Sequence, residues 1–166
     1  ALNNTALGYT ALTDLRTGNS NVGVGKGAGA ALTTASSNIA IGKDAMFVHT
    51  TGGNNIAIGD AAMDDTNAGS SSLGSTDNIF IGVNSGGGTW ADVASYNNVA
   101  VGSGTMSAAL NGAIYSTAIG YAALQAVTTG DYNTALGAST LNALTSGAAN
   151  LAIGQKALYT HTTGSR

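Results

Sequence analysis

Two histidines are the residues best suited to bind a metal or to move a proton, but their spacing keeps them apart. His49 and His161 each lie seven residues after a glycine of a repeat that runs through the chain. If each repeat forms one coil of a stack, the six coils between them span roughly 29 Å. The chain has neither Cys nor Glu, and no His stands near the cluster of Asp residues that begins at Asp60, so neither a zinc site nor a nucleophilic triad can be assembled plausibly. We interpret both histidines as exposed corner residues.

Two further motifs only superficially resemble ligand sites. The run 23–29 alternates glycine with other residues, but a phosphate loop needs a strand before it and a helix after it. Asp60, Asp64, Asp65 and Asp77 form the only concentration of acidic residues. A Ca²⁺ site needs six to eight oxygen ligands, and this spacing matches no known loop, so a solvated bend is favoured over a cation site. We expect no cofactor, no metal and no enzymatic activity.

Aromatic side chains that interrupt the repeat are candidates for ligand contact. Trp90 and Tyr96 lie in an irregular stretch, with Asp92 between them. Exposed aromatic rings stack on sugars and anchor protein contacts. We therefore predict that Trp90, Asp92 and Tyr96 contact a receptor. For Trp90 a second interpretation stays open, in which the indole fills a gap where the coil geometry breaks.

These residues are carried by a repeat of the form Asn-x-Ala-Ile-Gly. Its reference glycines are separated by 17, 17, 17, 23, 20, 18, 17 and 17 residues, and they are Gly8, Gly25, Gly42, Gly59, Gly82, Gly102, Gly120, Gly137 and Gly154. A short fixed period is typical of a solenoid, in which stacked coils share one core. We predict an all-β solenoid of about nine 17-residue coils. It forms one segment over 1–166, with regular coils over 4–59 and 116–166 and irregular coils over 60–115.

The residues just before each glycine predict a short strand of four or five residues. The structural repeat residues are clearest in three coils: Asn38, Ile39, Ile41 and Gly42; Asn55, Ile56, Ile58 and Gly59; and Asn150, Ile153 and Gly154. Aliphatic residues share one face of the strand, and Ala or Gly share the other. Neither face is polar. We therefore expect one face to line the coil, and the face of small residues to point outward and pack against other chains.

Two other repeat positions have expected roles. The Asn that opens most copies is expected to stack into a ladder of side chains at one corner. A Leu or Met four residues after the reference glycine, as in Met46 and Leu124, is expected to fill the core.

Composition excludes several classes of protein. With 25 Gly and no Pro, 8% charged residues and a mean hydropathy of +0.15, the chain is neither collagen nor disordered. Its five basic residues are scattered, so we expect no nucleic-acid partner. No apolar run is long enough to insert into a membrane. The absence of Cys and of a disulfide framework fits a large extracellular or virion protein stabilised by stacking. Both ends read as parts of coils, and we expect the chain to be an excerpt of a longer fibre protein.

The repeat resembles known surface fibres over essentially the whole chain. Asn-x-Ala-Ile-Gly is similar to the head repeat of YadA-like trimeric autotransporter adhesins, and the unit from Asn133 to Gly147 is closer to repeats of phage tail-fibre proteins. The resemblance implies a homotrimer of left-handed parallel β-rolls, extracellular on a virion or at a bacterial cell surface. It implies attachment to a host through a glycan or protein receptor. The 17-residue unit and the irregular centre favour a phage tail fibre over an autotransporter adhesin head.

Recurring threonine pairs suggest a further alternative, binding to ice or a mineral surface. The pairs recur in register at 33–34, 50–51, 128–129 and 162–163. Ice-binding solenoids present Thr-x-Thr on a strand, so that both hydroxyls point the same way. Adjacent threonines at a turn do not, which makes this alternative weaker than the fibre.

Overall fold

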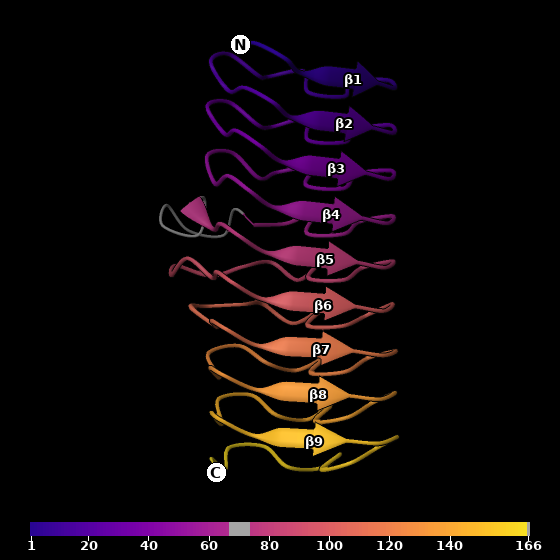
Figure 1. The fold of residues 1–166 in the computed structure, drawn as a ribbon, viewed down its shortest axis with the longest axis vertical. Coiled ribbons are helices and arrows are strands. Elements are labelled where there is room, and N and C mark those ends of the chain that lie inside the picture. Colours follow the sequence, from indigo (N-terminus) through magenta and orange to yellow (C-terminus); the bar gives the residue numbers. More distant parts are fainter. Residues whose placement is uncertain (67–73, 166) are drawn as a thin grey trace.

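The computed structural model, which describes residues 1–66 and 74–165, is a rod built from one parallel β-sheet. The strands stack in chain order along the rod, with the two termini at opposite ends (Figure 1). Their bounds are β1 Thr5–Leu7, β2 Val22–Val24, β3 Ile39–Ile41, β4 Ile56–Ile58, β5 Ile79–Ile81, β6 Val99–Val101, β7 Thr117–Ile119, β8 Thr134–Leu136 and β9 Leu151–Ile153. The predicted all-β solenoid with coils of about 17 residues is confirmed. Each strand has three residues rather than four or five, because the reference glycine that follows turns the chain.

Strand register is unbroken across the coils that carry extra residues. Ile56 pairs with Ile79, Ile79 with Val99, and Val99 with Thr117, each in the same position of its strand. Parallel pairing at a constant offset keeps the same side chains on the same face of every coil. The extra residues that the structure describes in the irregular coils therefore lie outside the sheet.

The assignment of the two strand faces from sequence was wrong. The small residues point into the coil, where Ala40, Ala57 and Ala100 are completely buried, and the large aliphatic residues point outward. The space beside the inward Ala is filled by large side chains from the opposite side of the coil. Gly23 shows how tight the space is, since a Cβ added there would lie 2.8 Å from Cγ of Leu12.

Each coil is filled from the side opposite its strand. The predicted core position four residues after the reference glycine is confirmed, because Met46, Met63, Met106, Leu124 and Leu141 are completely buried. All five adopt φ values between 45° and 52°. This left-handed backbone is costly for a large residue, and the burial of the side chain offsets the cost.

A second core position lies seven residues after the reference glycine and was missed in the sequence. Leu32, Val127 and Leu144 occupy it and are completely buried. The aliphatic residues recurring there at the repeat spacing were the available signal. This position and the previous one, together with the inward Ala, make one large core cluster, and Leu12, Leu32 and Ala35 make a second, smaller cluster.

The predicted asparagine ladder is confirmed and is buried. Oδ1 of Asn38 accepts from the backbone N–H (2.9 Å) and the side-chain amide (3.2 Å) of Asn55 in the next coil. The Asn38 amide itself donates to the carbonyl of Gly52 at 2.9 Å. In coil seven Ser116 replaces Asn, and its Oγ accepts from the backbone N–H of Asn133 at 3.1 Å. The ladder satisfies backbone groups that leave the sheet at this corner and would otherwise be buried without partners.

Candidate functional site

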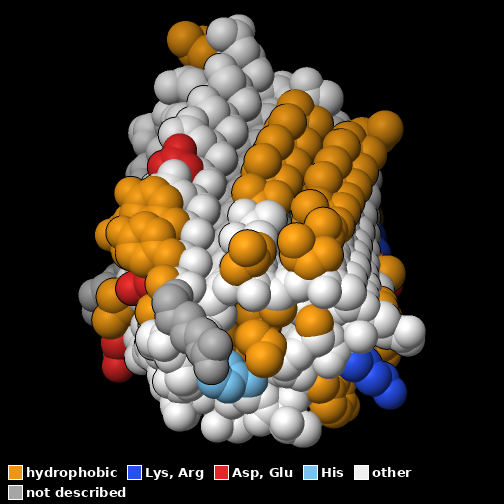
Figure 2. All heavy atoms as spheres, turned by 60° about the horizontal axis from the view of Figure 1, so that its bottom comes forward, with side chains coloured by type: hydrophobic (Ala, Val, Ile, Leu, Met, Phe, Trp, Pro, Cys, Tyr) orange, Lys and Arg blue, Asp and Glu red, His pale blue; other side chains and the backbone are white. Residues whose placement is uncertain are grey.

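The largest unusual surface is the outward face of the sheet, which we call the aliphatic face. Figure 2 shows its two neighbouring rows of hydrophobic side chains running along the rod. The first row is Thr5, Val22, Ile39, Ile56, Ile79, Val99, Thr117, Thr134 and Leu151, and the second is Leu7, Val24, Ile41, Ile58, Ile81, Val101, Ile119, Leu136 and Ile153. None of these outward positions in the nine strands is charged. The stacked residues cover one another only in part, and Ile119 remains 40% exposed.

Trp90, predicted to contact a receptor, is completely buried and cannot do so in this conformation. Its indole N–H donates to the carbonyl of Gly86 at 2.8 Å, and its ring packs edge-on against Phe80 at 5.6 Å between centroids. In this coil the large core residue comes from the strand and the small one from the opposite side, the reverse of most other coils. Phe80 replaces the inward Ala, and Gly86 replaces the inward Leu or Met, where a Cβ would lie 2.6 Å from the Phe80 ring. The interpretation of Trp90 as a core-filling residue is the one the structure confirms.

Asp92 and Tyr96 are exposed, and Tyr96 belongs to a larger aromatic cluster. The Tyr96 and Tyr115 rings meet edge-on at 6.0 Å, and the Tyr115 and Tyr132 rings stack with planes 7° apart and centroids 5.2 Å apart. We call these three residues the tyrosine ladder. Tyr115 and Tyr132 were missed as site residues, although each directly precedes a position of the asparagine ladder and the two are one coil apart.

Comparison with protein-family models, with curated proteins and with solved structures found no match to this chain.

His49 is buried, so the prediction of an exposed corner residue was wrong. It occupies the second core position, where other coils have Leu or Val. Its Nε2 lies 3.0 Å from the carbonyl oxygen of Gly52, and its Nδ1 lies 2.9 Å from Oγ1 of Thr66. Nε2 faces both the Gly52 carbonyl, which can only accept, and the Asn55 side-chain amide at 3.2 Å, which can donate, while the Thr66 hydroxyl can donate to Nδ1 or accept from it. Burial lowers the pKa of His49 to about 4, so the ring is neutral at pH 7 and serves as a structural residue.

Acidification is expected to destabilise the fold through His49. Burial lowers the pKa of His49 from 6.5 to about 4. Between these values the unfolded chain binds a proton that the folded chain does not, so stability is full above pH 6.5 and falls as the pH drops toward 4, by up to about 3 kcal/mol. Urea unfolding at pH 7.5 and at pH 4.5 measures the change. His49→Leu, which places the Leu32 residue type in the same position, should flatten this pH dependence; an equally steep dependence in the variant would contradict the assignment.

The remaining chemical candidates do not assemble into a site. Asp60 is exposed and forms an ion pair with Lys43 at 3.7 Å, and Oδ2 of Asp65 accepts from the Thr89 hydroxyl. Burial and the charge of Asp65 raise the pKa of Asp64. Among the residues that the structure describes, no group of three His, Cys, Asp or Glu could hold a metal ion, and no pocket is found. Nor does any helix in that part of the chain have the length and apolarity needed to cross a membrane.

The threonine pairs do not present a free array of hydroxyls. Oγ1 of Thr33 donates to the carbonyl of Thr50 at 3.2 Å, and Oγ1 of Thr128 donates to the carbonyl of Thr145 at 3.1 Å. These hydroxyls join one coil to the next. The geometry therefore gives no support to ice binding.

Proposed function

We propose that the chain is a segment of an extracellular trimeric fibre, of the kind found in phage tails, which extends from its carrier and attaches to a host surface. The observation that carries the proposal is the aliphatic face. Soluble monomers rarely expose contiguous apolar patches of more than a few hundred Å². The second row of this face is aliphatic in all nine strands, on the order of 38 Å along the rod, and the first row is aliphatic except at Thr5, Thr117 and Thr134.

A second copy of the same chain is the partner best matched to this face. Parallel rods of identical pitch can align coil for coil, so that each aliphatic row meets another over its whole length. The two rows of one chain can each face a different neighbour, which suits a closed ring of three with one repeated, head-to-tail contact. The resemblance to trimeric adhesin heads and tail fibres supports the number three.

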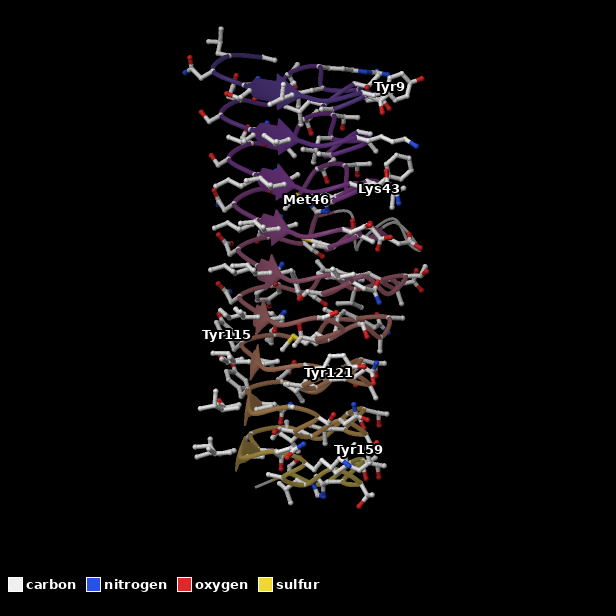
Figure 3. The ribbon with its side chains drawn as sticks, turned by 90° about the vertical axis from the view of Figure 1, so that its right-hand side faces the viewer. Tyr9, Lys43, Met46, Tyr115, Tyr121 and Tyr159 are labelled. Atoms are coloured by element: carbon white, nitrogen blue, oxygen red, sulfur yellow. The ribbon has the colours of Figure 1, made fainter. Side chains whose placement is uncertain are left out.

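Such an assembly needs its charged residues away from the buried face, and the ion pairs of Lys43 fit this need. Lys43, with its ion-pair partners Asp44 and Asp60, lies away from the strand edge (Figure 3). Aromatic residues Tyr9, Tyr121 and Tyr159 also lie on that side of the rod. In a trimer closed through the aliphatic faces, these polar and aromatic groups stay in solvent. A fibre of this design leaves its outer surface free for contact with a receptor.

The mass of the particle in solution tests the proposal. Light scattering during size-exclusion chromatography is expected to give three times the 16.1 kDa chain mass. Ile58→Asp places a charge on the aliphatic face of every chain, and because an unpaired charge is costly to bury, we expect trimers to be lost. The control is Ser103→Asp, an exposed residue just after Gly102 and outside the strands, which should leave the mass unchanged. A soluble wild-type chain with the mass of a monomer would refute the proposal.

A further inference from the structure

We propose that the tyrosine ladder, with Asp131 beside it, binds a neutral saccharide. This inference rests on the proposed function and names the ligand class for a surface on the strand side of the rod, where Tyr115 lies (Figure 3). It is carried by three features of coils six to eight: an exposed stack of rings, an unfavourable backbone conformation used to hold two of them, and a local absence of positive charge.

The ladder is open to a ligand at its C-terminal end. Exposure rises along it, from 38% at Tyr96 through 48% at Tyr115 to 57% at Tyr132. The next coil has Ala149 at the position of Tyr132, and the two coils are joined there by the Ala149 N–H, which donates to the Asp131 carbonyl at 2.9 Å. No ring follows Tyr132 in the next coil, and Tyr132 is the most exposed of the three rings. A sugar ring, with an apolar C–H face and hydroxyl edges, fits a ring of this kind with polar groups beside it.

The polar groups of the tyrosine ladder and of Asp131 have hydrogen-bonding capacity left for a ligand. None of the three phenol hydroxyls makes a hydrogen bond within the described residues. One carboxylate oxygen of Asp131 accepts from the backbone N–H of Ile114 at 3.0 Å, which fixes the side chain next to Tyr132. These groups offer donors and acceptors to sugar hydroxyls around the aromatic surface.

The backbone shows that tyrosine is an unusual choice at this position. The residue before each position of the asparagine ladder has a positive φ, and this angle is 54° at Tyr115 and 55° at Tyr132. Elsewhere the same position is filled by residues that are small or tolerate this conformation: Asn3, Ser20, Ser37, Asn54, Asp77, Asn97 and Ala149. A bulky residue there is strained, and strain of this kind gathers at functional sites. Burial does not offset it here, in contrast to Met46, because both tyrosines are exposed.

The local charge selects the kind of saccharide. No Lys or Arg occurs between Lys43 and Lys156, whereas Asp92 and Asp131 stand near the ladder in sequence. A sialylated, sulfated or phosphorylated glycan would meet negative charge without a cation to pair with it. The ladder therefore fits an uncharged chain of hexose or N-acetylhexosamine units.

An array of neutral oligosaccharides, with sialylated and sulfated oligosaccharides in separate spots, tests the inference on the full chain. The test variant is Tyr132→Asn, which installs the residue type of Asn54 at the same position and so keeps the coil. The control is Tyr121→Ala, which removes a tyrosine that is 65% exposed and lies away from the ladder. We expect wild type to bind at least one neutral glycan, Tyr132→Asn to weaken that binding about tenfold, and Tyr121→Ala to leave it unchanged.

Each other outcome overturns the inference. Binding to no neutral glycan, preferential binding to anionic glycans, or equal loss in both variants would each exclude the ladder as a neutral saccharide site. Loss of the trimer mass in Tyr132→Asn would show that the ladder belongs to the contact between chains. If wild type is a trimer that binds no neutral glycan, only the saccharide site fails and the trimeric fibre stands; a monomer that binds through Tyr132 would refute the fibre alone.

Discussion

Gly42→Ala is expected to prevent folding or to reduce stability by more than about 4 kcal/mol, among the largest effects of single substitutions. Gly42 has φ 134°, a conformation that residues with a side chain rarely adopt. A Cβ there would also lie 2.6 Å from the carbonyl carbon of Gly59 in the next coil. Because the nearest atoms are all backbone atoms, of Gly59 and Asp60 in the next coil, no side chain can move to relieve the clash. Soluble yield and the midpoint of thermal unfolding measure the loss.

Gly104→Ala is the matched control for this substitution. Gly104 has a positive φ of 67°, but only Nε2 of Gln125 lies near its potential Cβ, at 3.9 Å. Ala61 and Ala122 occupy the same position in their own coils at φ 53°. We expect Gly104→Ala to change stability by less than about 1 kcal/mol. Equal loss from both substitutions would show that close coil-to-coil approach at Gly42 is not the cause.

Asn55→Ala is expected to cost about 3 to 5 kcal/mol, because it breaks the buried ladder in two directions. The Asn55 amide donates to Oδ1 of Asn38 at 3.2 Å and to the carbonyl of Ser75 at 2.9 Å. Its Oδ1 accepts from the backbone N–H and the side-chain amide of Asn78, each at 3.1 Å. Alanine leaves these buried groups without their partner. Chemical denaturation of the variant and wild type gives the difference.

Two serine substitutions separate the contribution of the asparagine ladder to stability from the effect of any substitution at this corner of the coil. Asn55→Ser should lose less than Asn55→Ala, since Ser116 fills a ladder position and accepts from the next coil. Asn54→Ser changes the neighbouring position, where Ser20 and Ser37 already occur, and should be nearly neutral. A neutral Asn55→Ala would show that the ladder contributes little to stability.

The candidate site could be predicted only in part from the sequence. The irregular stretch correctly placed Asp92 and Tyr96 at the surface, but it also suggested an exposed Trp90. Trp90 packs against Phe80, which stands where other coils have a small residue, and Phe80 fits there because Gly86 stands where other coils have Leu or Met. Such compensation is a contact between positions that periodicity treats separately. The tyrosine ladder likewise arises from stacking between coils, which brings Tyr115 and Tyr132 together although they are 17 residues apart.

Periodicity by itself determined the architecture of this protein. Glycines at a step of about 17 residues, each preceded by alternating aliphatic and small residues, indicate short parallel strands in register, and the ladder follows because Asn recurs at the same step. Tertiary structure alone decided which strand face is the inside. Alternation shows that two faces differ, but only the width of the coil, filled from the opposite side by residues such as Met46 and Leu32, requires Ala within and leaves Ile and Val outside. His49, which the sequence suggested was exposed, is buried because its position points into this core.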